Sequence, residues 1–314
     1  QLVAGPIERA KKLMPQLLQR QPFTFENLEQ GIRLILWGLL KKIVVADRLI
    51  HAAYPAFLDP GSFTTGELVF SASGMLVALY LDFSAYSEIA RGVARLFGIR
   101  LSINFNFPHT ATNAADYWRR WHMTMSSWVH DYLFVPLGGF HPRHFWRHTR
   151  ITLITMGLVG LWHGAAWNFI FWGLGHGLYL IIYQIIRLKI LRKYRKHVFF
   201  MSLPWRFGSW CFNIATRVLI GVCFFAPDFS RLKIFLYRIL IQPDLAGFNK
   251  PSILLGLGII ISFWIFHYLR SKSDMQKHID TWNPMLRGAG YAFLIYLILF
   301  GAVDTAEQFI YYQF

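Results

Sequence analysis

The residue best placed to do chemistry is His163, because it lies inside the longest stretch of the chain that carries no charge. Residues 151–186 contain no Asp, Glu, Lys or Arg, and His163 stands among them in the string GLVGLWHGAAWNFIFWG. An ionisable residue in such an apolar run indicates function by default. Burial would keep the imidazole neutral, so that it could take a proton from an attacking hydroxyl and return it to a leaving thiolate. A histidine that only hydrogen-bonds a neighbouring helix is the alternative.

A second histidine, His122, follows the run DYWRRW and lies beside strong charges. Arg119 and Arg120 precede it, and Asp116 comes shortly before them. Guanidinium groups pair well with phosphate, so the two arginines could bind lipid phosphate or a phosphate-bearing donor such as coenzyme A. Composition alone favours a surface or headgroup position for His122.

A different chemistry follows from histidine spacing. His163 and His176 are as far apart as His109 and His122, and two such pairs on facing transmembrane helices could ligate haems. The second pair lies in a segment with proline and arginine, which makes a poor transmembrane helix. A transporter is another alternative outside the enzymes. Signatures of serine-nucleophile, Walker-loop and zincin enzymes are absent, and no metal site is expected.

The composition indicates a membrane protein of one all-helical class. Of 314 residues, 55% are hydrophobic and 18% aromatic. A helical crossing needs about 20 apolar residues, so residues 151–186 must form two helices or one helix and a re-entrant piece. Residues 253–269 and 290–303 are shorter uncharged runs. Residues 68–86 and 207–226 would each span if Asp82 or Arg217 were tolerated, and five or six crossings are expected.

The formal net charge of +16 comes from loops rather than from a nucleic-acid patch. Lys and Arg lie between the apolar runs, most densely in residues 187–196, which are expected to face the cytoplasm and anionic lipid headgroups. The bilayer is therefore the predicted partner, and nucleic acid is not. Arg217 is expected to snorkel near a helix end, and the two cysteines, Cys211 and Cys223, to be buried packing residues.

The chain reads as one membrane domain, residues 1–314, with three distinct segments. Residues 1–50 suggest a loop with a short amphipathic helix, then a helix that lies at the interface or reaches into the membrane only partway, because an unpaired Lys41 and Lys42 are costly to bury. Residues 91–150 are polar and aromatic, as expected of interfacial helices that line a cavity. In residues 151–186, glycines at small-xxx-small spacing predict a closely packed catalytic helical pair.

Four long motifs carry a resemblance to a known family. They are QLVAGPIERAKKLMPQL, LDFSAYSEIARGVARLFGIRLSINFNFP, DYWRRWHMTMSSWVHDYLFVPLGG and LWHGAAWNFIFWGLGHG. Together they resemble the bacterial membrane-bound O-acyltransferases, and within that family the alginate O-acetyltransferase branch. The resemblance implies a multi-pass transmembrane helical bundle around a central tunnel. It also implies that N-terminal transmembrane helices are missing from this chain.

The resemblance also assigns candidate site residues. The histidine of the family's WHG motif falls on His163, and the histidine that ends its WRRWH motif falls on His122. Trp162 and Trp167 are expected to form an aromatic wall that excludes water from the thioester. The complete set of predicted tunnel or donor-binding residues is Asp82, Asn104, Trp118, Arg119, Arg120, Asp131, Trp162 and Trp167.

The function expected from this resemblance is transfer of an acetyl group from a cytoplasmic thioester, acetyl-CoA, towards an extracytoplasmic polysaccharide such as alginate. No tightly bound cofactor is expected, and the protein would lie in the bacterial inner membrane and work with a periplasmic acetyltransferase. D-alanyl transfer to teichoic acid is the alternative within the family. His130 stands where related sequences usually have Arg, and Ala85 where Gly is usual, which bears on donor binding and subfamily.

Overall fold

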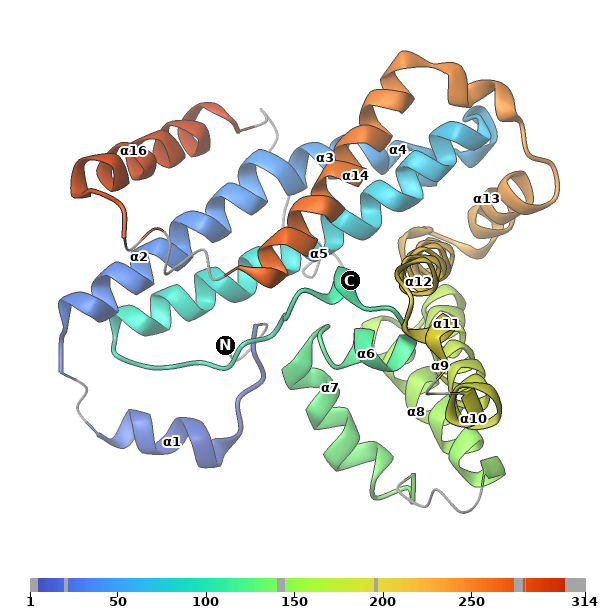
Figure 1. Cartoon of the computed structure of the whole chain (residues 1–314), viewed down its shortest axis with the longest axis horizontal. Helices are drawn as coiled ribbons and strands as arrows, with labels where there is room; N and C mark the ends of the chain where they lie inside the picture. Colours follow the sequence, from blue (N-terminus) through green and yellow to red (C-terminus); the bar gives the residue numbers. More distant parts are fainter. Residues whose placement is uncertain are drawn as a thin grey trace. The chain divides into compact units, whose positions relative to one another are not determined.

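The protein is built from helices. The computed structural model describes residues 5–19, 22–139, 145–194, 197–273, 279 and 281–302, and it has no strand in these ranges (Figure 1). The predicted all-helical membrane fold is therefore confirmed. The chain divides into two compact units. Unit 1 comprises Gln1–Ala52, Val77–Asn106 and Tyr268–Phe314, and unit 2 comprises Ala53–Leu76 and Phe107–His267. That residues 1–314 form a single membrane domain stays a prediction.

Four described helices are long and apolar enough to cross a membrane. They are α5 (Thr65–Leu96), α9 (Trp167–Ile186, continued to Ile190), α12 (Leu203–Phe225) and α14 (Pro251–Lys272). The helix α16 (Pro284–Phe300) is apolar but shorter. Five or six crossings were expected, so the described residues supply fewer long spans than the sequence suggested. Asp82 and Arg217 are both tolerated within long helices, as the sequence required.

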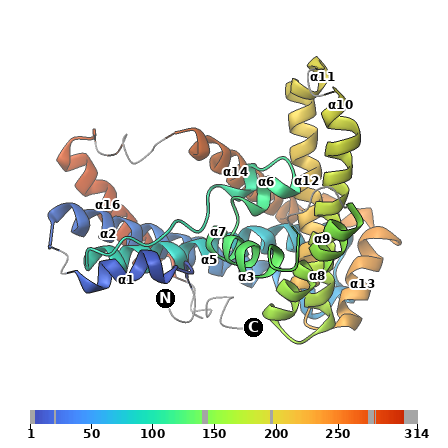
Figure 2. The same ribbon diagram turned by 90° about the horizontal axis from the view of Figure 1, so that it is seen from below.

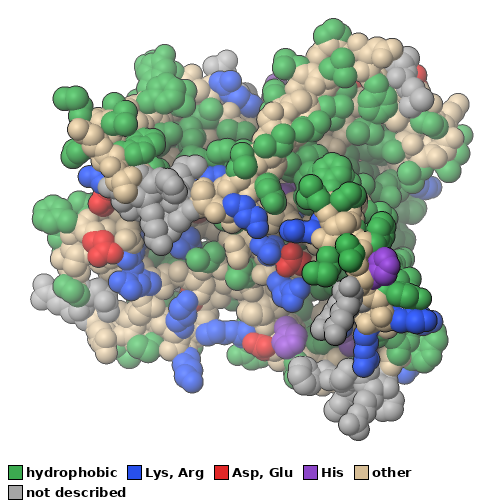
Figure 3. Space-filling model, viewed as in Figure 1, with side chains coloured by type: hydrophobic (Ala, Val, Ile, Leu, Met, Phe, Trp, Pro, Cys, Tyr) green, Lys and Arg blue, Asp and Glu red, His purple; other side chains and the backbone are tan. Residues whose placement is uncertain are grey.

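The surface of these helices suits lipid. Leu254, Leu255 and Ile259 of α14 are 57%, 68% and 56% exposed, and hydrophobic side chains cover much of the face in Figure 3. Such an array of exposed aliphatic side chains is unfavourable in water and favourable in a bilayer. The chain is accordingly a membrane protein.

In unit 1, α2 (Phe25–Leu39) packs closely against α5. A Cβ atom added at Gly31 would lie 2.9 Å from the carbonyl oxygen of Gly92, and one at Gly38 would lie 2.9 Å from that of Ala85. Small residues therefore let the two backbones approach. The other helices of unit 1 include α1 (Ala10–Leu18), the π-helical turn η1 (Leu40–Ala46), α3 (Asp47–Ala53) and α16. The short helix expected near the start of the chain is α1.

The turn η1 directs two lysines into the protein, where both have carboxylate partners, so the premise that they are unpaired is wrong, while the interfacial or partial position of the helix stays a prediction. The Lys41 Nζ atom lies 2.7 Å from an oxygen of Glu88, and the Lys42 Nζ atom bridges Asp47 and Asp82 at 2.7 Å and 2.8 Å. Both lysines are buried. The expected interfacial position assumed unpaired lysines. Each lysine instead has a carboxylate partner, which offsets much of the cost of burial.

Unit 2 holds residues 107–150 of the segment that was expected to be dense in polar chemistry, and residues 91–106 belong to unit 1. Short helices follow one another here: η3 (Pro108–Thr110), α6 (Ala114–Trp118), α7 (Met123–Val129) and η4 (His130–Phe134). After them come α8 (Phe145–His163), α9, η5 (Arg187–Leu191), α10 (Arg192–Tyr194), α11 (Val198–Met201), α12, α13 (Phe229–Leu240) and the first part of α14. Residues 140–144 of the polar segment and residues 195–196 of the basic run lie outside the described residues.

Helices α8 and α9 form a hairpin whose backbones touch. A Cβ atom at Gly160 would overlap the carbonyl oxygen of Phe169, and one at Gly173 would overlap that of Met156. No side chain larger than hydrogen fits either position without moving a helix. The predictions of two helices in residues 151–186 and of close glycine packing between them are both confirmed.

Two further predictions about unit 2 were wrong. Arg217 does not snorkel at a helix end, because it lies well inside α12 and is only 1% exposed. Cys211 is not buried but exposed, while Cys223 is intermediate. A single apolar run does not reveal which of its faces meets protein and which meets lipid.

Candidate functional site

His163 is the last residue of α8, where the chain turns towards α9. Its ring is enclosed by aromatic side chains, with centroid distances of 4.9 Å to Trp162, 5.0 Å to Trp172 and 5.1 Å to Phe224. The Trp172 and Phe224 rings meet it nearly edge to face, at 86° and 81°. The hairpin geometry thus holds the imidazole in an apolar, aromatic environment, which favours its neutral form.

His122 lies at the start of α7 in a left-handed backbone conformation, with φ 42° and ψ 55°. A residue other than glycine adopts this conformation at a cost, and such strain clusters at functional sites. The side chain is 3% exposed. Burial, and after it the positive charge that a protonated His163 would carry, lowers the pKa of His122 to about 3. His122 is therefore neutral at pH 7.

The structure brings the two predicted histidines together although they come from separate segments. Both belong to unit 2, and the charge of His163 affects the ionisation of His122. Two neutral imidazoles near each other can accept a proton from a substrate hydroxyl and pass it to a leaving group. Such a pair needs no metal, and no group of three or more potential metal ligands occurs in the part of the chain that the structure describes.

Beyond His163, aromatic and imidazole rings continue into the core of unit 2. The Trp172 ring lies 5.0 Å from His176, which in turn lies 5.1 Å from Trp118 and stacks at 6.0 Å on Tyr117. His109, one of the histidines considered for haem ligation, lies in the short turn η3 rather than in a long helix. The two facing pairs of transmembrane histidines that haem ligation requires are therefore absent from the described residues.

Arg217 of α12 contacts residues of the polar segment. Its Nη1 atom lies 3.3 Å from Nδ1 of His109, and its guanidinium carbon lies 4.4 Å from the centre of the Tyr117 ring. The neighbouring Asn213 donates to the carbonyl oxygen of Ala111 at 2.6 Å. Among the described residues no carboxylate pairs with Arg217. This buried cation is thus held by imidazole, ring and backbone groups.

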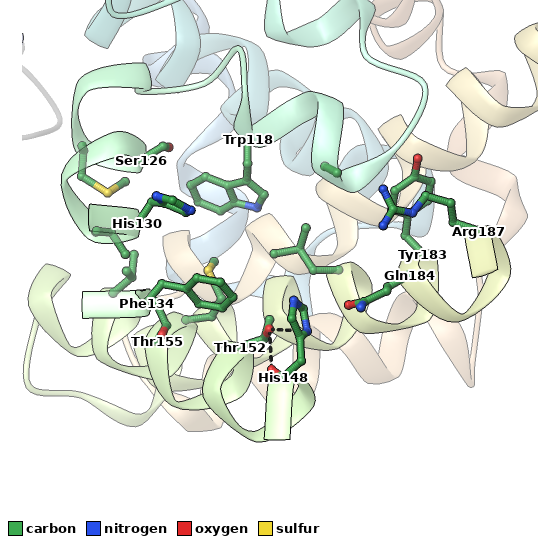
Figure 4. Close-up of a pocket in the computed structure, with 16 residues that line it drawn as sticks. Trp118, Ser126, His130, Phe134, His148, Thr152, Thr155, Tyr183, Gln184 and Arg187 are labelled. Atoms are coloured by element: carbon green, nitrogen blue, oxygen red, sulfur yellow. Dashed lines mark hydrogen bonds between the residues drawn. The ribbon is translucent and has the colours of Figure 1, made fainter. Parts of the chain in front are cut away.

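A groove of about 400 Å³ lies between the polar segment and the α8–α9 hairpin (Figure 4). Val159 and Thr155 of α8 line it, one and two helical turns before His163, and Trp118 forms part of the opposite wall. The Trp118 Nε1 and Thr155 Oγ1 atoms are buried and have no hydrogen-bond partner in the structure. Arg187 lies at one end of the groove. The wall is apolar but offers isolated polar atoms to a ligand.

The remaining predicted site residues have varied positions. Arg120 pairs with Asp116 at 3.0 Å, whereas the Arg119 side chain is 72% exposed and lies 3.9 Å from the same carboxylate. Asp131 contacts its neighbour His130, with 2.9 Å between the Asp131 oxygen and Nδ1. Both arginines and Asp131 are thus near the surface of unit 2, where their predicted roles stay predictions.

The prediction of an aromatic wall needs one correction. Trp162 does contact His163, but Trp167 is 69% exposed and its ring contacts Phe171 instead. Trp172 and Phe224, which the sequence analysis did not single out, enclose the histidine in its place. Helical spacing could have identified the groove residues Thr155 and Val159, because they precede His163 by two turns and one turn on the same face.

Two predicted tunnel residues belong to unit 1. Asp82 is fully buried and pairs with Lys42, as described above. Asn104 is 1% exposed and donates through Nδ2 to Ser87 Oγ at 3.3 Å. Both have partners within their own unit, so their local geometry indicates a structural role there. Their predicted part in a tunnel stays a prediction.

Long apolar helices and two electrostatically coupled histidines of unit 2 are the features that known proteins can be compared with. Residues 1–226 match the model of the MBOAT, membrane-bound O-acyltransferase, family. The chain belongs to that family, as its motifs suggested.

Individual relatives include a peptidoglycan O-acetyltransferase from Helicobacter pylori, 38% identical over 59% of this chain and 35% of that protein. A probable alginate O-acetylase AlgI from Azotobacter vinelandii is 38% identical over 60% of this chain and 37% of its own length. A teichoic acid D-alanyltransferase from Streptococcus thermophilus is 30% identical over 64% and 52%. The chain therefore spans about a third to a half of the length of these curated relatives.

Proposed function

We propose that this chain forms the catalytic part of an O-acyltransferase that moves an acetyl group from a cytoplasmic thioester towards an extracytoplasmic polysaccharide. The hydroxyl oxygen of the acceptor attacks the thioester carbonyl, a C–O bond forms and the C–S bond breaks. His163 takes the hydroxyl proton and delivers it to the departing thiolate, so the products are an ester and a free thiol. His122 assists by positioning the substrate or by sharing the proton.

The observation that carries this proposal is the meeting of His122 and His163. His122 and His163 come from separate segments but lie in one region of unit 2, and their apolar surroundings favour the neutral forms of both imidazoles. A neutral imidazole is the form that a general base requires near pH 7. The family to which the chain belongs is named for acyl transfer to oxygen, which is the reaction that such a base would promote.

The groove beside the hairpin suits the arm of a thioester donor. An acyl donor such as acetyl-CoA carries a long, mostly apolar arm interrupted by amides and ended by phosphates. The apolar wall with unpartnered Trp118 Nε1 and Thr155 Oγ1 atoms could bond such amides, while Arg187 could bind a phosphate. His163 follows Val159 of the same wall by one turn, which would direct the acyl end of the donor towards the base.

We propose acetyl as the acyl group because the relatives named for O-acetylation are more similar to this chain than the D-alanyltransferases are. The peptidoglycan O-acetyltransferase and the alginate O-acetylases are 36–38% identical to the chain, and the teichoic acid D-alanyltransferases are 29–30% identical. D-alanyl transfer from a carrier-protein thioester is the second candidate, and the same histidines would serve it. A periplasmic acetyltransferase that completes delivery to the polymer and an inner-membrane location belong to the acetyl proposal.

The deciding experiment follows radiolabelled acetyl from acetyl-CoA into polysaccharide. Membranes would contain the full-length native protein together with its gene neighbours, and wild type would be compared with His163→Gln. His51→Gln is the matched control, because His51 is an exposed histidine of unit 1. We expect label in polymer for wild type and control, and a loss of at least about a thousandfold for His163→Gln, as removal of an essential base gives.

Other outcomes separate the parts of the proposal. Transfer that survives in His163→Gln would contradict the role of the histidine. Label that reaches polymer only from a D-alanyl carrier protein would replace acetyl by D-alanyl and leave the histidine in place. Solubilised His163→Gln must elute from a sizing column like wild type, since otherwise its inactivity would reflect misfolding.

A further inference from the structure

A second cavity in unit 2 adjoins the groove assigned to the donor, and Tyr183 lines both. It has a volume of about 530 Å³ and lies between α9, α12 and the short helix α11. Its apolar lining includes Ile182 and Ile186 of α9, Phe199 of α11, and Trp205 and Phe212 of α12. Both long helices are candidate membrane spans, so a cavity of this lining is open to the hydrocarbon chains of lipid.

The end of this cavity carries a concentration of positive charge. Ile186 and Phe199 both line the cavity, and the stretch that joins them contains η5, α10 and the basic residues. Figure 2 shows α10 and α11 at one common end of α9 and α12. In the described part of this stretch, Lys189, Arg192 and Lys193 are exposed. Residues 187–203 contain no Asp or Glu, so nothing within the stretch neutralises the cations.

Aromatic contacts tie the cations to the cavity wall. The Lys193 ammonium lies 5.3 Å from the ring of Tyr194, which stacks on Phe200 at 6.4 Å. Phe200 meets Trp205, a lining residue, at 4.8 Å and 85°. Trp and Tyr gather at the level of lipid headgroups in membrane proteins. The rim of the cavity therefore combines interfacial aromatics with exposed cations that have no acidic residue within their own stretch, residues 187–203.

From this arrangement we propose that the cavity binds one anionic glycerophospholipid of the bilayer. The acyl chains would lie between α9 and α12, and the headgroup phosphate would meet the cations of the η5–α10 stretch. A zwitterionic lipid would fill the apolar space equally well but would gain less from the cations. The cavity does not include the histidine pair or the Trp118–Thr155 wall, although Tyr183 lines both cavities and Arg187, at the end of the donor groove, is the first residue of η5.

Gly208 offers a way to fill the cavity without a clash. It lines the cavity, and a Cβ atom at this position would meet no atom within 4 Å. Gly208→Leu would therefore place an isobutyl group where we expect a lipid chain. Gly258 of α14 is the matched control, because it is also an exposed helical glycine with nothing within 4 Å but does not line the cavity.

The test is native mass spectrometry of the full-length protein after incubation with vesicles of equal parts phosphatidylglycerol and phosphatidylcholine. Wild type and Gly258→Leu are expected to retain a phosphatidylglycerol adduct in preference to phosphatidylcholine. Gly208→Leu should lose that adduct at least about fivefold. Retention of phosphatidylglycerol by Gly208→Leu at the control level would overturn the proposal.

A second variant keeps the test decisive if Gly208→Leu does not fold. Neutralising the exposed cations together, as Lys189→Gln, Arg192→Gln and Lys193→Gln, should leave total lipid retention unchanged but abolish the preference for phosphatidylglycerol. Equal preference in this variant and wild type would contradict the assigned headgroup site. Displacement of the phosphatidylglycerol adduct by added coenzyme A would show that the cavity belongs to a soluble donor and would also overturn the proposal.

Discussion

The two units bury polar groups in opposite ways. Unit 1 pairs its buried charges, with Lys41 against Glu88 and Lys42 between two carboxylates. Unit 2 instead buries the imidazole of His122 and holds Arg217 without any carboxylate among the described residues. Paired charges have little left to offer a substrate, whereas a neutral imidazole can still accept a proton. The contrast separates a scaffold from the proposed reaction site.

The contrast also explains why unit 1 tolerates charge inside long helices. The Asp82 carboxylate lies within α5 and its cost of burial is offset by Lys42, which η1 turns towards it. A π-helical turn is uncommon, and here it brings two successive lysines inside. An ion-pair network of this kind stabilises the packing of two helices but is not expected to transfer protons.

The largest expected effect is on unit 1. Asp82→Ala removes one of the two carboxylates that lie against the buried Lys42 ammonium, which should lower the free energy of unfolding by about 3–5 kcal/mol. The measurement is thermal unfolding of the detergent-solubilised full-length protein. Replacing all three charged members by uncharged residues, Lys42→Met with Asp47→Asn and Asp82→Leu, should recover much of the loss. No recovery in the triple variant would mean that the ion-pair cluster does more than compensate charge.

A smaller loss in the free energy of unfolding is expected when Arg217, the buried cation of unit 2, is removed. Arg217→Met leaves no buried carboxylate behind, so the cost is that of its contacts with His109 and the Tyr117 ring, about 1–3 kcal/mol. The same unfolding measurement compares it with Asp82→Ala. If Arg217→Met proved the more damaging of the two, the contrast between a paired and an unpaired unit would be wrong.

The smallest expected effect is a dependence of stability on pH. The pKa of His122 is lowered to about 3 in the folded protein, below the ordinary value of about 6.5. The unfolded chain therefore takes up the proton first as the pH falls. The stability contributed by neutral burial is complete above about pH 7.5, and about 1.4 kcal/mol is lost by pH 5.5.

The check on that pH effect is a comparison of variants. His122→Gln cannot take up this proton, so its stability should fall by about 1.4 kcal/mol less than that of wild type between pH 7.5 and pH 5.5. Identical pH profiles for the two proteins would mean that His122 is accessible to protons when folded. Its neutral form would then not be secured by burial, and the two units would differ less than the structure indicates.

Much of the fold could be predicted because it depends on local composition. Uncharged runs identified α9 and α14, runs with one charge identified α5 and α12, and the glycines of residues 151–186 predicted the close hairpin. His163 could be selected because an ionisable residue is rare in such a run. These features follow from residues close together in the sequence, where hydropathy and spacing carry the information.

The errors concern partners that are distant in the sequence. Lys41 and Lys42 looked unpaired because Glu88 and Asp82 lie on a different helix. Arg217 looked like a snorkelling residue because its neighbour His109 comes from a loop that folds back to it. Nothing in the order of residues states such pairings, which depend on how helices and loops pack.

The touching backbones of Gly160 and Gly173 have a consequence for how substrate preference can change. With main chain against main chain just before His163, the backbone position of this residue is fixed by the approach of α8 and α9 rather than by the size of nearby side chains. Rings such as Trp162 or Phe224 can then be exchanged to admit a different acyl group while the proposed base stays in place. Engineering of a new specificity should therefore vary the rings and leave the two glycines untouched.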